Sequence, residues 1–157
     1  MRGLILIVSY WIHLVASVIW IGGIAFVLFI AIPKAKQVLG AEASKLMVEF
    51  GKRFTLLVNY SIAFLALTGI ALISLNRAPL AGEIFEKRWM IIAIKHIVFL
   101  AMIIIHFYRG LVLAPKIGKA ASSAEKANLQ KLSLSLVKVN FGLGLITLLL
   151  SGILHIA

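Results

Sequence analysis

Two histidines, His13 and His96, are the residues of this sequence best suited to bind a metal or a metal-containing cofactor. They lie 83 residues apart in two halves that resemble one another. Two further motifs recur at offsets of 83 and 82: Thr68-Gly69-Ile70 as Ser151-Gly152-Ile153, and Pro33-Lys34 as Pro115-Lys116. A parallel repeat places equivalent residues at equal depth in a membrane. Two facing imidazoles at one depth are the axial ligands that a bis-histidine haem requires.

The composition indicates an integral membrane protein. Of the 157 residues, 62% are hydrophobic and 13% are charged, far from the soluble average. A span needs about 20 apolar residues, so the chain predicts an all-α membrane protein, a four-helix transmembrane bundle built from two parallel hairpin repeats. The predicted spans are roughly 4–32, 54–75, 90–114 and 134–156. We expect one domain over 1–157, with repeats at about 1–76 and 84–157.

Proline and capping residues predict where the helices begin and end. Pro33 and Pro115 mark ends or kinks of the first and third helices, because proline disrupts a helix interior. Ser122 followed three residues later by Glu125 is typical of a capping box. Gly40 precedes a similar start. The second and fourth helices should therefore begin before they enter the lipid.

The distribution of Lys and Arg predicts the orientation in the membrane. Of the 16 basic residues, 11 fall on the side of the 33–53 and 115–138 segments and five on the opposite side. Basic residues favour the cytoplasmic side, so we expect an inner-membrane protein with both termini in the periplasm. The net charge of +11 is explained by the anionic surface of the lipid bilayer, and no nucleic-acid partner is expected.

The predicted depths of the four histidines differ. At about 1.5 Å per residue, His13 and His96 lie about 30 Å from the cytoplasmic boundary and His155 about 26 Å. His106, nine residues before Pro115, lies nearer the middle. Trp20 and Gly23 share the helix face of His13, where a small residue and an indole suit a flat macrocycle. Small residues on membrane helices also serve helix packing, so that alternative stays open.

Helix four carries a small, polar stripe: Asn140, Gly144, Thr147, Ser151 and His155. Polar groups are penalised when they face lipid tails. The stripe is therefore expected to point into the bundle.

The donor set favours haem over copper. Cu(I) prefers thiolate and thioether ligands, whereas the chain has no Cys and its four Met residues form no Met-x-x-Met pair. Haem b needs only two imidazoles and an apolar slot. We therefore expect His13 and His96 as axial ligands, with Arg88 and Lys95 pairing with the propionates. The expected role is electron transfer with a quinone or another redox partner, which would make the chain a membrane oxidoreductase.

Copper uptake or resistance is the alternative. In that interpretation His13, His96 and His155 form an outer metal site, and His106 with Met102 provides the onward path. A haem-dependent porphyrinogen oxidase is a third hypothesis. The sequence leaves open whether two bundles pair as a homodimer.

Several of these residues together resemble a known family. The stretch from Trp11-Ile12-His13 through Trp20-Ile21-Gly22-Gly23, then Arg53-Phe54, Leu67-Thr68-Gly69, Lys95-His96 and Arg109, is similar to the four-helix membrane domain of the copper resistance protein D family. That resemblance implies copper handling. A more distant similarity links His13 and Arg53 to the haem-binding protoporphyrinogen oxidase of the HemJ type. Lys95 follows Trp89 by six positions, which departs from the spacing expected of that second family.

Overall fold

Every regular element in the described part of the chain is helical. The computed structural model describes residues 1–75 and 83–156. Four helical stretches in these ranges are long and apolar enough to cross a membrane: Arg2–Leu39, Ala43–Leu75, Arg88–Lys119 and Ser123–Leu154. The predicted all-α membrane fold with four spanning helices is confirmed.

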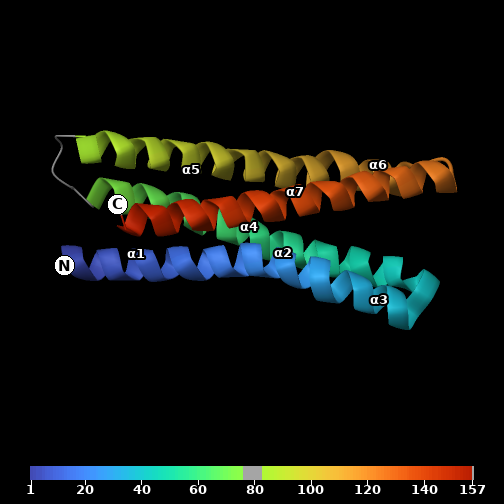
Figure 1. Cartoon of the computed structure of the whole chain (residues 1–157). Helices are drawn as coiled ribbons and strands as arrows, with labels where there is room; N and C mark the ends of the chain where they lie inside the picture. The colour runs from blue at the N-terminus through green and yellow to red at the C-terminus, as the bar shows by residue number, and fades with distance from the viewer. Residues whose placement is uncertain (76–82, 157) are drawn as a thin grey trace. The chain divides into compact units, whose positions relative to one another are not determined.

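The chain divides into two compact units, Met1–Leu80 and Ala81–Ala157. Each unit is a pair of antiparallel helical rods joined at one end (Figure 1). The single domain over 1–157, with its two repeats parallel, stays a prediction.

The first unit consists of a long rod and one returning helix. The rod contains α1 (Arg2–Ser17), a π-helical turn (Val18–Gly22), α2 (Gly23–Phe26), a second π-helical turn (Val27–Ala31) and α3 (Ile32–Leu39). After a 3₁₀ turn over Gly40–Glu42, α4 (Ala43–Leu75) runs back beside it. The reversal uses Gly40 at φ +51°, a left-handed conformation that glycine adopts without a Cβ clash. At the other end, the Arg2 guanidinium donates to the carbonyl of Leu75.

The core of the first unit is a seam between the rod and α4. Ala16, Trp20 and Ile24 follow at intervals of four and are buried, so they lie on one helix face. On α4 the buried residues are Ala43, Val58, Ser61, Ile62, Leu65 and Thr68. A Cβ on Gly23 would collide with the Phe54 ring, so the glycine permits this close approach.

The second unit has the same plan. Its rod contains α5 (Glu83–Phe107), a π-helical turn (Tyr108–Leu113) and α6 (Ala114–Lys119), and α7 (Ser123–Ile156) returns beside it. The predicted cap is present, because the Glu125 N–H donates to Ser122 Oγ at 3.1 Å. The Glu125 carboxylate accepts from the N–H of Ala121 at 3.0 Å, one residue before the position that a capping box predicts.

The two predicted proline breaks lie inside continuing helices. Neither rod ends at Pro33 or Pro115, and in each a π-helical turn finishes two residues earlier, at Ala31 or Leu113. Proline lacks an N–H and crowds the carbonyl four residues before it, and a wide turn accommodates both effects. Ala31 and Leu113 are 82 residues apart, like the prolines. The repeat is therefore present in the backbone as well as in the sequence.

The second and fourth helices begin well before their apolar spans, as predicted. They start at Ala43 and Ser123, each 11 residues before the predicted span. The extra turns of α4 carry an exposed ion pair, Lys52 with Glu49 at 2.6 Å. These turns are amphipathic extensions of helices that tertiary packing stabilises farther along.

Candidate metal site

His13 is held by a hydrogen bond between the two helices of the first unit. Its Nδ1 lies 2.8 Å from Thr68 Oγ1, and that hydroxyl lies 2.5 Å from the carbonyl oxygen of Phe64. The hydroxyl proton is directed to the carbonyl, so Thr68 accepts and His13 Nδ1–H donates. This assignment of the tautomer puts the ring lone pair on Nε2, the nitrogen that would bind a metal.

His96 presents the same nitrogen by a different contact. It is exposed on α5, and its Nδ1 lies 2.6 Å from the Ile92 carbonyl oxygen. A carbonyl can only accept, so Nδ1 again carries the proton. Ser151, the counterpart of Thr68, donates to Thr147 within its own helix at 2.8 Å. The repeat thus preserves the histidine tautomer while its hydrogen-bond partners differ.

Trp20 and Gly23 both face the core of the first unit. Trp20 is 1% exposed, and Gly23 packs against Phe54. The contact of Gly23 with Phe54 is a helix-packing contact, which is the alternative role that the sequence left open for the small residues. Their role toward a cofactor stays a prediction.

The remaining predicted site residues lie in the second unit. Arg88 and Lys95 are half-buried on α5. His155 falls in the backbone of α7, outside the residues whose side chains are described. The facing of His13 and His96 depends on how the two units are arranged, so their joint site stays a prediction.

Among the described side chains of the second unit, Met102 and His106 form the most buried pair that could bind a metal. They are 1% and 8% exposed and lie four residues apart on one face of α5. The Thr147 hydroxyl donates to the Leu143 carbonyl at 3.0 Å and lies 3.8 Å from Met102 Sδ. The thioether therefore points toward α7. The sequence ranked His106 below His96, whereas packing buries His106 and leaves His96 exposed.

Asn140 lies opposite His106 across the interface of α5 and α7. Two contacts set the register of these helices: Thr147 with Met102, and Ser133 Oγ with Arg109 Nε at 3.3 Å. His106 lies between Met102 and Arg109, and Asn140 lies seven residues from both Ser133 and Thr147. Seven residues are nearly two helical turns, so Asn140 shares their face and the level of His106.

The Asn140 side chain is buried with an unsatisfied acceptor. It is 2% exposed, and its Oδ1 has no hydrogen-bond partner. Leaving such a group unpaired costs about 1–3 kcal/mol. Gly144, one turn along, is also buried. The predicted inward direction of the polar stripe is confirmed at these two positions.

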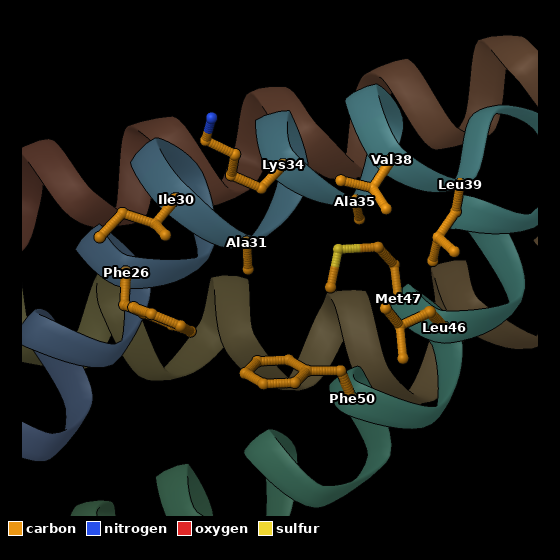
Figure 2. A pocket seen from close by; sticks show the side chains of 10 residues that line it. All are labelled: Phe26, Ile30, Ala31, Lys34, Ala35, Val38, Leu39, Leu46, Met47 and Phe50. Carbon is orange, nitrogen blue, oxygen red and sulfur yellow. The ribbon is translucent and has the colours of Figure 1, made fainter.

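A groove of about 400 Å³ lies in the first unit between α3 and the start of α4. Figure 2 shows its lining, which is nearly all hydrocarbon, with the amino group of Lys34 pointing away from it. Met47 contributes the one sulfur among the lining residues, and no imidazole accompanies it. The groove therefore lacks a set of metal ligands.

No three His, Cys, Asp or Glu side chains come together as a metal site within the part of the chain that the structure describes. A site among these residues would have to use other donors, such as a thioether or a side-chain amide. Met102, His106 and Asn140 supply these donor types. The sequence paired Met102 with His106 and placed Asn140 in a polar stripe of another helix. It did not give the register that aligns the three, because that register depends on the packing of α5 on α7.

Comparison with known proteins supports one of the sequence hypotheses. The family model for copper resistance protein D matches residues 48–154, and no curated protein or solved structure matches the chain. The family points to copper, the alternative of the sequence analysis, and gives no support to haem b, cytochrome b or electron transfer. The similarity to the HemJ type stays a prediction. The match covers most of the second spanning helix and all of the third and fourth. It extends over more than half of the chain, so the chain belongs to the copper resistance protein D family.

Proposed function

We propose that this chain binds copper ions inside the membrane and carries them across it. The observation that carries the proposal is the pair of Met102 and His106, buried at 1% and 8% exposure on one face of α5. An ionisable residue such as His106 is rare inside a spanning helix and by default indicates a functional site. The family of the chain, copper resistance protein D, supports copper as the ion.

The two donors suit Cu(I). Thioether sulfur is a soft ligand that selects Cu(I), and imidazole binds copper well. Both ligands are neutral when they bind, so the ion brings the single positive charge of the complex. A low net charge reduces the penalty of placing the ion in a medium of low dielectric constant. The four-residue spacing places the two side chains on neighbouring turns.

His13 is the donor that we assign to the first unit. Its bond to Thr68 at 2.8 Å holds the ring in the tautomer with its lone pair on Nε2. Such an outer partner orients a histidine for metal binding. We assign His13 to capture of the ion near the outer side, in line with the periplasmic termini predicted from the basic residues.

Copper binding by the purified protein tests the proposal. The full chain in detergent micelles competes with a chromogenic Cu(I) chelator under ascorbate, with Met102→Leu and His106→Leu as variants. Met90→Leu is the matched control, because Met90 lies on the same helix and is 59% exposed. We expect each test variant to lose affinity by about tenfold or more and the control to match the original chain.

Two results would overturn the proposal. One is binding that is equally strong in the original chain and in the double variant. The other is a purified protein with a Soret band and stoichiometric haem, which would restore the haem hypothesis.

A further inference from the structure

The buried carboxamide of Asn140 has no role in the fold that accounts for it. Its Oδ1 accepts no hydrogen bond, although the side chain is 2% exposed. A polar group in a spanning helix is normally paired. An unpaired acceptor on the face of α7 that packs on α5, near the level of His106, is suited to a positively polarised group.

We propose that Asn140 Oδ1 is the release ligand for the cation, next to the Met102 and His106 pair in the interface of α5 and α7. This inference rests on the proposed copper function and adds a direction to it. Asn140 lies at the level of His106, and both helices contribute to the passage.

The three donors are arranged in order of decreasing softness. Side chains on a helix lean toward its N-terminus, and α5 and α7 are antiparallel (Figure 1). Met102 therefore leans away from the α6 end of the unit, and Asn140 leans toward it. A cation that moves along the interface exchanges thioether sulfur for imidazole nitrogen and then for amide oxygen. Cu(I) binds oxygen more weakly than sulfur, so its hold loosens in one direction.

A positively charged side chain, Arg109, lies beyond Asn140 on the same faces. Arg109 is half-buried, and its Nε donates to Ser133 Oγ at 3.3 Å. Its positive charge repels a cation that approaches without ligands. The amide oxygen of Asn140, just before Arg109, provides a weak binding position from which the ion leaves. Conduction requires binding sites that are weak enough to release the ion.

The experiment separates release from binding. The full chain is reconstituted into phosphatidylcholine vesicles that contain a Cu(I) chelator, and Cu(I) with ascorbate is added outside. Binding is measured on the same preparations in detergent. Asn140→Leu removes the donor at similar size, and Ser135→Leu is the control, since Ser135 is an exposed residue of the same helix.

We expect Asn140→Leu to bind Cu(I) within about twofold of the original chain and to transport it about tenfold more slowly or worse. Ser135→Leu should match the original chain in both assays. Unchanged transport by Asn140→Leu overturns the inference. So does a parallel loss of binding and transport, because Asn140 would then belong to the binding site itself.

A second variant decides the matter if Asn140→Leu does not fold. Asn140→Met replaces the weak donor with a soft one, so Cu(I) should be held about tenfold more tightly and released more slowly. Unchanged or faster transport by this variant contradicts the softness order. Failure of the original chain to bind copper is a different result, because it overturns the proposed function.

Discussion

Thr68 of α4 accepts a hydrogen bond from the imidazole of His13 on the facing helix, with Nδ1 and Oγ1 2.8 Å apart. The threonine hydroxyl donates its own hydrogen bond to the Phe64 carbonyl. This one contact therefore joins α1 to α4 and fixes the His13 tautomer, with the ring lone pair on Nε2. In a metal site, loss of such a partner typically lowers metal affinity by about 10- to 100-fold.

Replacing Thr68 with Val should weaken copper capture at His13 by about 10- to 100-fold, because the ring loses the acceptor that fixes its tautomer. Thr68→Ser should retain most of the affinity. The measurements are Cu(I) competition and the ¹⁵N shifts of the labelled imidazole, which report the tautomer directly. Thr55→Val, on the same helix, is the control. If Thr68→Val keeps both the affinity and the imidazole shifts, this hydrogen bond does not position a ligand.

Copper retention should depend more on His106 than on His96. His106 is 8% exposed beside the buried Met102, whereas His96 is exposed. We expect His106→Gln to lower Cu(I) affinity by about tenfold or more and His96→Gln to have a smaller effect. The opposite order, accompanied by bound haem that disappears in His13→Ala and His96→Ala, would support the bis-histidine haem that the sequence alone favoured.

The capping contact at the start of α7 should contribute measurable stability. Ser122→Ala removes the oxygen that accepts from the Glu125 N–H at 3.1 Å, which costs about 1 kcal/mol. The expected result is faster hydrogen exchange in the first turn of α7, with copper binding unchanged. Ser135→Ala serves as the control on the same helix. Equal exchange in the Ser122 and Ser135 variants would show that packing alone holds this turn.

The orientation predicted from the basic residues can be tested with reporters. Fusions at Ala157 should be active with a periplasmic enzyme and inactive with a cytoplasmic fluorophore, because 11 of the 16 basic residues lie on the other side. A fusion within the turn at Gly40 should give the reverse pattern. Activity of the cytoplasmic reporter at Ala157 would invert the topology, and with it the direction of copper movement.

Much of the fold follows from the sequence, because burial of hydrocarbon in a bilayer determines it. Hydropathy predicts four spans, and four such helices lie in the described residues 1–75 and 83–156. Ser122 and Glu125 predict the start of α7, since capping depends on residues close in the chain. The two prolines mark equivalent points of the repeat, but they do not predict the local helix geometry at those points. Whether a helix ends, bends or widens at proline depends on its packing against a neighbour.

For the candidate site, too, some properties follow from the sequence and others depend on tertiary packing. The sequence alone determined the membrane class and the family resemblance. It also predicts the depth of each histidine, because depth is estimated by counting residues along a helix of known rise. Only tertiary structure decided which side of each helix faces a partner. Packing of α5 on α7 buried His106 and Met102 with Asn140 opposite, left His96 exposed, and in the first unit placed Thr68 against His13. Facing is a property of two helices in contact, and no spacing within one helix specifies it.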